Sequence, residues 1–297
     1  MVSHSNLHLP HSITYIHISQ RKRFTHISST SDSPIRIAAS SYLNSAPLIW
    51  SFLHGSRRGV ADFVEPVPAR CAQLLAQAEV DVALVPVIEY QRTPEVSLVS
   101  NVCVASRKEV HSVILVSRDC ELENVTSVAL DESSRTSATL IKVIFREFLN
   151  REPRWSTHSP NLDEMLAHND AALMIGDPAM VLPRNTLRVW DMAGLWRNYT
   201  GLGFVFAMWM VRNDSLNKAR TIDFAAARDE GVAHKDEIVA QYHDLLGLSP
   251  DSLRHYLDEN ISFNLDDELR RGLDLYFTLA HKHQLLDQLK PLKTIEP

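Results

Sequence analysis

Cysteine is scarce in this chain of 297 residues, which contains only Cys71, Cys103 and Cys120. No two of them form a CxxC pair, so the sequence offers neither a disulfide framework nor a cysteine-based metal site. The 14 histidines include no HExxH pattern, the arrangement that many zinc hydrolases use. We therefore expect no metal, and a reducing compartment.

Long apolar runs are also missing. None approaches the roughly 18 residues that a membrane-spanning helix needs. The N-terminus lacks the order of a signal peptide, because the basic run Arg21–Arg23 comes late and has no apolar core behind it. We expect a cytoplasmic protein without a membrane partner. The formal net charge of −6 argues against nucleic-acid binding through phosphate contacts.

Three motifs of enzymes and nucleotide-binding proteins are absent: GxSxG, GxGxxG and GxxxxGK[ST]. Neither a serine-hydrolase nucleophile nor a bound nucleotide is therefore indicated. His111 is the one histidine expected at a strand end. It is either a general base or a solvated loop residue.

Residues 1–34 are polar, rich in Ser and His and without sustained periodicity, so we expect a disordered extension. From Ile35 onward, short apolar runs such as Asp81–Val85 and Ala171–Ile175 alternate with helical patterns. This alternation predicts an α/β fold with mostly parallel sheets. From Asp214 to the C-terminus the pattern is helical, with segments near 215–226, 235–246, 250–260 and 266–283.

Polar turns are expected at five strand ends: Ser40–Asn44, Arg107–Ser112, Asp131–Ser137, Gly176–Asp177 and Trp196–Thr200. In open α/β sheets, ligands bind beyond the carboxyl ends of the strands. The five turns are rich in hydroxyls and amides and poor in carboxylates. Together they predict a cleft for a small polar anion.

The turn after Val128–Leu130 is the most informative of the five. It carries hydroxyls and one cation: Ser133, Ser134, Arg135, Thr136 and Ser137. The apolar residues that follow have helical spacing. The unpaired N–H groups and the dipole of a helix start favour an anion there. The alternative is an ordinary capped helix start, because Ser and Thr are common caps.

Single residues in the other turns have two interpretations each. Asn44 can hold a hydroxyl or a carboxylate, or can stabilise its own turn. Ser112 is a ligand donor or a strand-edge serine, and Asp177, before Pro178, is a ligand contact or a helix cap. The cations near the proposed cleft are Arg36, Arg107, Arg135 and Arg197, any of which can pair with a carboxylate.

Four motifs occur together in a telling order: SYLNSAPL (Ser41–Leu48), VALDESSRTSATL (Val128–Leu140), MIGDPAM (Met174–Met180) and WRNYTGLGFVFAMW (Trp196–Trp209). In order and spacing they resemble the chorismate dehydratase family of the futalosine route to menaquinone. DVALVPVIEY (Asp81–Tyr90) and VHSVILVSR (Val110–Arg118) fit the same pattern. The resemblance covers the chain from about Ile35 to the C-terminus.

The resemblance implies a type II periplasmic-binding-protein-like fold, with two α/β lobes and an active site between them. On this basis we expect lobe one at residues 35–112 plus 205–297, and lobe two at residues 113–204. Val87 stands where the family often has Ser, and Gly203 where Pro is usual. Neither departure removes a residue to which a catalytic role is assigned.

The resemblance also implies an activity: a hydro-lyase that removes water from chorismate to give 3-[(1-carboxyvinyl)oxy]benzoate, without a cofactor. Asn44 and Ser112 match the family positions that face the reacting ring. The predicted substrate-binding residues are Ser41, Tyr42, Ser133, Ser134, Arg135, Thr136, Ser137, Gly176, Asp177 and Thr200. The matched turns hold no strong base, which fits the family proposal that the substrate's own enolpyruvyl carboxylate accepts the proton.

Two alternatives stay open. The first is a non-catalytic protein of the same fold that binds a carboxylate ligand. The second is the related 1,4-dihydroxy-6-naphthoate synthase, which acts later in the same pathway. That family typically opens with a Ser-Pro-Cys-Pro-Asn turn, which Ser40–Pro47 does not resemble.

Overall fold

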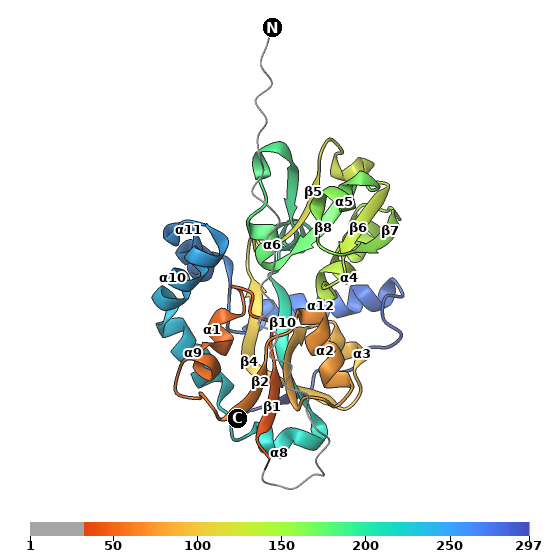
Figure 1. Ribbon diagram of the computed structural model, residues 1–297. Coiled ribbons are helices and arrows are strands. Elements are labelled where there is room, and N and C mark those ends of the chain that lie inside the picture. The colour runs from red at the N-terminus through yellow and green to blue at the C-terminus, as the bar shows by residue number, and fades with distance from the viewer. Residues whose placement is uncertain (1–32, 297) are drawn as a thin grey trace. The chain divides into compact units, whose positions relative to one another are not determined.

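Two β-sheets with helices packed around them make up the described part of the chain, residues 33–296, in this computed structural model (Figure 1). The first sheet has the strand order β11-β4-β10-β3-β1-β2, and the second has the order β7-β6-β8-β5-β9. Each sheet forms the centre of one lobe. The extension predicted for residues 1–34 lies outside the described residues except for its last two positions.

The strands of the first sheet come from both ends of the described chain: β1 (Ile35–Ala38), β2 (Ala61–Val64), β3 (Val82–Pro86), β4 (Val96–Ser106), β10 (Phe204–Arg212) and β11 (Thr294–Ile295). Those of the second sheet come from the middle: β5 (Val113–Ser117), β6 (Ser127–Asp131), β7 (Arg154–His158), β8 (Ala171–Ile175) and β9 (Arg188–Asp191). The lobe division at residues 112/113 and 204/205 stays a prediction.

In each sheet a single strand runs against the others. β10 pairs antiparallel with β3 and β4, and β5 pairs antiparallel with β8 and β9. The remaining pairs are parallel, so both sheets are mostly parallel, as predicted. The reversed strands are the first strands after the chain passes from one sheet to the other, since β5 follows β4 and β10 follows β9.

The helices fill the connections between strands. In the first lobe they are α1 (Ala46–Leu53), α2 (Pro68–Ala76), α3 (Glu89–Arg92), α8 (Leu216–Ala219), α9 (Phe224–Ala233), α10 (Lys235–Leu246), α11 (Pro250–His255), η5 (Tyr256–Asn260) and α12 (Asp267–Lys282). In the second they are α4 (Thr136–Val143), η2 (Ile144–Phe148), α5 (Leu162–Ala167), α6 (Gly176–Met180) and α7 (Met192–Thr200). Short 3-10 turns lie at Leu122–Asn124, Arg184–Thr186 and Asn213–Ser215.

Two local predictions are wrong. The single helix expected at 215–226 is two helices, α8 and α9. A new helix starts because Asp223 caps it, its Oδ1 accepting from the N–H of Ala226 at 2.8 Å. The loop expected over Trp196–Gly203 is helical as far as Thr200, because α7 begins at an Asp191 cap and ends at Gly201 in the left-handed region.

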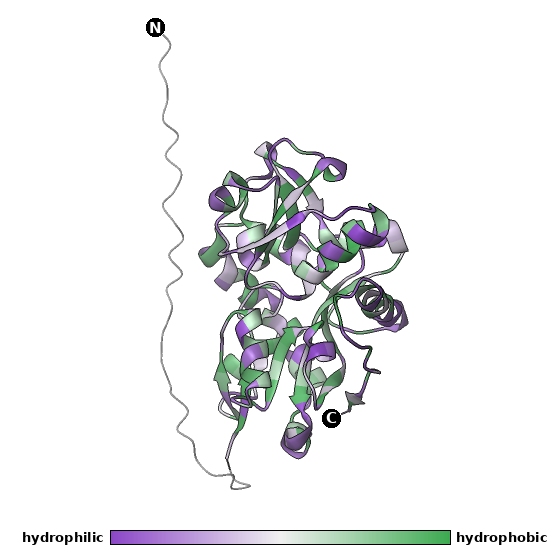
Figure 2. Ribbon diagram, turned by 90° about the vertical axis from the view of Figure 1, so that its right-hand side faces the viewer, coloured by the Kyte–Doolittle hydropathy of each residue, from purple (hydrophilic) through white to green (hydrophobic). Residues whose placement is uncertain are grey.

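The core follows the apolar runs of the sequence. Every residue of β3, β5, β6 and β8 is buried, which confirms the buried strands expected at Asp81–Val85 and Ala171–Ile175. Figure 2 shows hydrophobic residues concentrated in the sheets, and hydrophilic ones on the outer faces of the helices. Because the interior is filled by strands, polar groups gather at the strand ends.

Candidate functional site

A cavity of about 60 Å³ opens where strand ends of the two lobes meet. One wall consists of the hydroxyl-rich residues 133–137 together with Gly176, all from the second lobe. The opposite wall includes Ser40, Tyr42 and Asn44, which follow β1. The floor is made of apolar residues of β3, β4 and β10. Among the described residues, no Asp, Glu, His or Lys lines this cavity.

The turn before α4 is built by its own side chains. Asp131 Oδ1 accepts from the N–H and the hydroxyl of Ser133, at 2.8 and 2.6 Å. The Ser134 hydroxyl accepts from the N–H of Ala138 in the first turn of α4, at 3.2 Å. Ser134 therefore stabilises the helix start, as the capped-helix interpretation requires, whereas Ser133 bonds to Asp131 in the preceding turn. Both also line the cavity, so this contact does not separate the two interpretations.

Gly176 brings the two walls into contact. Its φ is +67°, a conformation that side chains other than glycine rarely adopt, and a Cβ there would lie 2.6 Å from the Tyr42 ring. The Tyr42 ring therefore packs against the backbone of Gly176. This contact joins the turn after β1 to the turn after β8.

Asp177 makes a second contact between the lobes. Its side chain is buried, and Oδ1 accepts from the N–H of Leu43 at 2.9 Å. Burial raises the pKa of Asp177 from 3.8 to about 7. Asp177 does not line the cavity. Through its bond to Leu43 it stabilises the turn that carries Asn44.

One buried phenol joins the two residues predicted to be catalytic. Asn44 lines the cavity, whereas Ser112 is 1% exposed and lies beside the wall, where its carbonyl accepts from the N–H of Gly176 at 2.7 Å. The Tyr256 hydroxyl donates to Ser112 Oγ at 2.7 Å, and the side chain of Asn44 lies close enough to the phenol to lower its pKa. Residues far apart in the sequence therefore form one hydrogen-bonded group.

The segment that leads to Ser112 is held rigidly. Asp191 at the end of β9 accepts from the N–H groups of Val110 and His111, at 3.0 and 2.6 Å. Arg184 donates to the His111 carbonyl at 2.7 Å. The His111 ring lies beside Arg184 and does not line the cavity, so it is not placed to act there as a general base.

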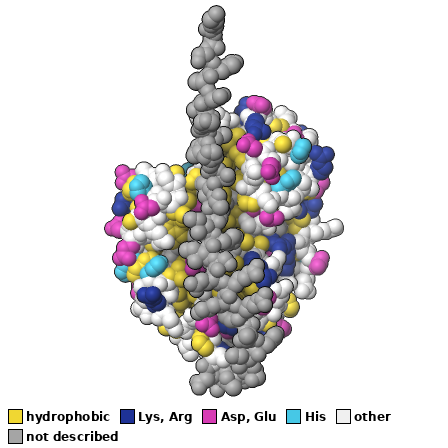
Figure 3. Space-filling view, viewed as in Figure 1, with side chains coloured by type: hydrophobic (Ala, Val, Ile, Leu, Met, Phe, Trp, Pro, Cys, Tyr) yellow, Lys and Arg dark blue, Asp and Glu magenta, His cyan; other side chains and the backbone are white. Residues whose placement is uncertain are grey.

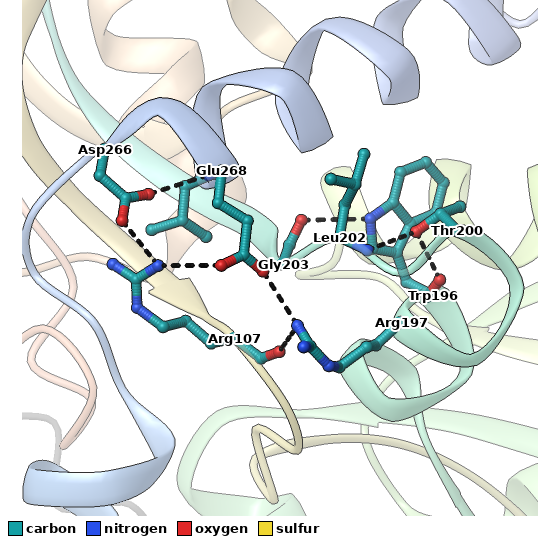
Figure 4. Close-up of polar contacts among 9 residues, drawn as sticks. Arg107, Trp196, Arg197, Thr200, Leu202, Gly203, Asp266 and Glu268 are labelled. Carbon is teal, nitrogen blue, oxygen red and sulfur yellow. Dashed lines mark hydrogen bonds and ion pairs between the residues drawn. The ribbon is translucent and has the colours of Figure 1, made fainter.

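Three of the four arginines expected near the cleft are paired elsewhere. Arg36 binds Asp81 at 2.6 Å. Figure 4 shows the other two pairs, in which Arg107 binds Asp266 at 2.8 Å and Arg197 binds Glu268 at 2.9 Å. Arg135 lines the cavity, and its buried Nε has no hydrogen-bond partner within residues 33–296. On the face shown in Figure 3, basic and acidic side chains are interspersed.

Ser41 and Thr200 are not among the cavity-lining residues. The Ser41 side chain is exposed, and its carbonyl accepts from the Tyr242 hydroxyl. The Thr200 hydroxyl donates to the Trp196 carbonyl at 2.7 Å and accepts from the N–H of Leu202 at 3.2 Å (Figure 4). Both residues shape turns in the structure, and their predicted contacts with a substrate stay predictions.

Sequence reasoning missed the tyrosines of the C-terminal helices. Tyr242 reaches Ser41, Tyr256 reaches Ser112, and the Tyr276 hydroxyl donates to the Thr136 carbonyl at 2.9 Å. In the sequence these residues resemble core aromatics at helical spacing, and most of each ring is indeed core. Only the fold shows that their hydroxyl groups meet the turns of the cleft.

The described residues offer neither a candidate metal site nor a helix able to span a membrane. No cluster of His, Cys, Asp and Glu within residues 33–296 has the arrangement of a metal site. None of the helices in this range combines the length and apolar character that crossing a bilayer requires.

Comparison with known proteins gives consistent results. The family described as menaquinone biosynthesis matches residues 35–282. A chorismate dehydratase of Thermus thermophilus is 31% identical over 254 residues, which cover 79% of this chain and 91% of that protein.

Several solved structures share the fold. A protein of Archaeoglobus fulgidus aligns with a TM-score of 0.69 at 16% identity, over 86% of this chain and 100% of that one. The periplasmic aliphatic sulphonate-binding protein of Escherichia coli aligns at 0.59 and 16%, over 89% and 95%. A Candida albicans protein with the generic periplasmic-binding-protein fold aligns at 0.59 and 13%, over 87% and 92%. The chain thus has this two-lobed fold and belongs to the menaquinone biosynthesis family that includes chorismate dehydratase.

Proposed function

We propose that the protein is a chorismate dehydratase, a hydro-lyase that converts chorismate to 3-[(1-carboxyvinyl)oxy]benzoate and water. The observation that carries this proposal is the lining of the cavity. Asn44 and the unpaired Arg135 face a small space beside a helix start, where no other described side chain carries a charge. The identity of 31% with the Thermus enzyme supports the same reaction.

The reaction does not require a strongly basic side chain of the protein. The hydrogen on C3 is made acidic by conjugation to the ring carboxylate, so its loss as a proton pushes charge into that carboxylate. The C4 hydroxyl then departs, the proton and hydroxyl together make one water, and the ring becomes aromatic. The protein needs to bind a dianion, stabilise developing charge and exclude bulk water.

Each wall of the cavity has a role in this scheme. The start of α4, with Arg135, holds one carboxylate of the substrate. Asn44 and Ser112 position the reacting ring. The substrate's enolpyruvyl carboxylate accepts the C3 proton, in keeping with a cavity whose described lining offers no basic side chain other than the permanently charged arginine.

Incubation of the purified protein with chorismate, followed by mass spectrometry, tests the proposal. Loss of one water with formation of an aromatic enol ether is the expected result. Saturable binding of unchanged chorismate would instead favour a non-catalytic binding protein, the alternative that the fold similarity to solute-binding proteins supports. Inertness toward chorismate, with turnover of a cyclic futalosine-derived substrate, would favour the dihydroxynaphthoate synthase.

Two further parts of the proposal concern organisation. We place the lobe boundaries at residues 112/113 and 204/205, where the strands pass from one sheet to the other. The proposed substrate is a small metabolite, and the cytoplasm is its expected compartment.

A further inference from the structure

Three tyrosines of the C-terminal helices send buried hydroxyl groups to the turns around the cavity. Those of Tyr242 and Tyr276 donate to main-chain carbonyls, which any residue type at the accepting position provides. The hydroxyl of Tyr256 differs because it donates to a side chain, Ser112 Oγ, and the side chain of Asn44 lies close enough to the phenol to lower its pKa. Its contacts therefore depend on the identity of both predicted catalytic residues.

The directions of these hydrogen bonds follow from the atoms available. The Tyr256 hydroxyl has one hydrogen and donates it to Ser112 Oγ at 2.7 Å. The Ser112 hydroxyl, as acceptor, keeps its own hydrogen for another partner. Because the single phenol hydrogen goes to Ser112, Asn44 can meet the phenol oxygen only as a donor, through its side-chain nitrogen, while its Oδ1 accepts from the Ser45 hydroxyl at 3.0 Å. The side-chain nitrogen of Asn44 carries two hydrogens, and the second can be donated to a ligand.

We propose that Tyr256 is a positioning residue, which turns Ser112 and Asn44 so that both present hydrogen-bond donors to the substrate. This inference rests on the proposed dehydratase function. Donors are what the reaction needs, because negative charge develops on the departing C4 oxygen and on the ring carboxylate. A hydrogen-bond acceptor at either residue would repel the negative charge that develops on these oxygens.

The surroundings keep the phenol in its donating form. Tyr256 is 2% exposed. Burial, with the nearby charges of Asp177 and Asp191, raises the pKa of Tyr256 beyond its ordinary value near 10. The hydroxyl therefore stays protonated at every pH suited to an assay, and it acts by orientation, not by proton transfer.

The variant Tyr256→Phe tests this role, with Tyr90→Phe as its matched control. Tyr90 is 1% exposed, and its hydroxyl also has two partners, the carbonyl of Pro291 and the N–H of Lys293, at 2.6 and 2.8 Å. Neither ring lines the cavity, but only the Tyr256 hydroxyl bonds to a residue predicted to be catalytic, so both variants lose a buried hydroxyl and only one loses contact with the site. We expect Tyr256→Phe to lower kcat about 10- to 100-fold with little change in KM, and Tyr90→Phe to leave both constants unchanged while lowering Tm at least as much.

A double-mutant cycle adds a readout that a purely structural role would not move. If Tyr256 acts through Ser112, the loss caused by Tyr256→Phe should be smaller in a Ser112→Ala background than in the parent protein. Equal losses in both backgrounds, equal kcat values for Tyr256→Phe and Tyr90→Phe, or failure of Tyr256→Phe alone to fold would each overturn the positioning role. Absence of chorismate turnover in the parent protein would overturn the proposed function itself, so the two failures are distinguishable.

Discussion

Asn44 is the residue whose side chain is best placed to meet a substrate. It lines the cavity, its amide oxygen accepts from the Ser45 hydroxyl, and its side chain lies close to the phenol of Tyr256. A fixed amide donor near developing charge typically contributes two to three orders of magnitude to a rate. The same side chain adds little to the core, because it is only half-buried.

Replacement Asn44→Ala should therefore lower kcat about 100-fold while Tm changes little. Steady-state assays with chorismate and a thermal melt measure the two effects. Asn161→Ala is the control, because Asn161 caps α5 by accepting from the N–H of Glu164 and lies away from the cavity. It should lower Tm and leave kcat unchanged. Near-normal turnover of Asn44→Ala would contradict the positioning role.

Asp177 links stability to pH. Its pKa is about 7 in the folded protein and 3.8 in its ordinary state, so the folded protein holds a proton that the unfolded chain releases between these values. Stability is therefore greatest at low pH in this window, and it falls as pH rises from about 4 to 7. Above pH 7 the buried carboxylate is charged and its destabilising effect is complete.

The replacement Asp177→Asn should remove this contribution, because an amide oxygen can still accept from Leu43 without charge. We expect its free energy of unfolding to exceed that of the parent at pH 8, by a few kcal/mol at most, and the two to converge near pH 4. Urea unfolding at both pH values measures the difference. A difference that does not depend on pH would show that Asp177 is ionised in the folded protein at pH 4.

Among the elements, the turns after β1, β4, β6 and β8 could be predicted from sequence because an apolar run stops at polar residues in each case. The same reasoning failed for 196–200, where aromatic and polar residues suggested a loop. The sequence signals of this helix were only two residues, Asp191 as its N-cap and Gly201 at its C-terminal end. The phenol of Tyr256 could not be found in this way, because its partner Ser112 is 144 positions away and only the packing of η5 brings them together.

The turn after β8 offers a test of how closely the walls of the cavity fit. Gly176→Ala forces a residue with a Cβ into φ +67° and also brings that carbon within 2.6 Å of the Tyr42 ring. Gly247 has nearly the same φ, +68°, but no atom lies within 4 Å of its Cβ position. Gly247→Ala therefore reports the backbone strain alone, about 1 kcal/mol.

We expect Gly176→Ala to lose more stability than Gly247→Ala, by roughly 1–3 kcal/mol, because of the added steric conflict. It should also raise KM for chorismate, since the ring of Tyr42 must move. Urea unfolding and steady-state kinetics measure the two effects. Equal losses of stability in the two variants would mean that Tyr42 moves aside freely, and that the two turns are not in firm contact.

At the scale of the molecule, the lobes are joined by bonds that need no ligand. Besides the Leu43–Asp177 bond, α12 of the first lobe reaches the second lobe through Glu268, which pairs with Arg197 at 2.9 Å, through Tyr276 and at its C-terminal end. Tyr276 donates to the Thr136 carbonyl at 2.9 Å, and Glu147 on η2 pairs with Lys282 and His283 at 2.7 and 2.6 Å. A binding protein that opens and closes around its ligand is held shut mainly by that ligand. Here the contacts across the boundary already exist.

The protein should therefore show the same radius of gyration by small-angle scattering with and without a bound product analogue. Combining Glu147→Ala with Tyr276→Phe removes two of these links, and it leaves the Arg197–Glu268 pair and the cavity-lining side chains in place. Because the remaining contacts are fewer, this variant should expand when ligand-free and contract when the analogue is added. A larger radius of gyration for the ligand-free parent than for its complex would contradict fixed lobes. If the radius of gyration of the double variant did not change, the lobes would instead be held by the segments that connect them, around Ser112 and Gly203.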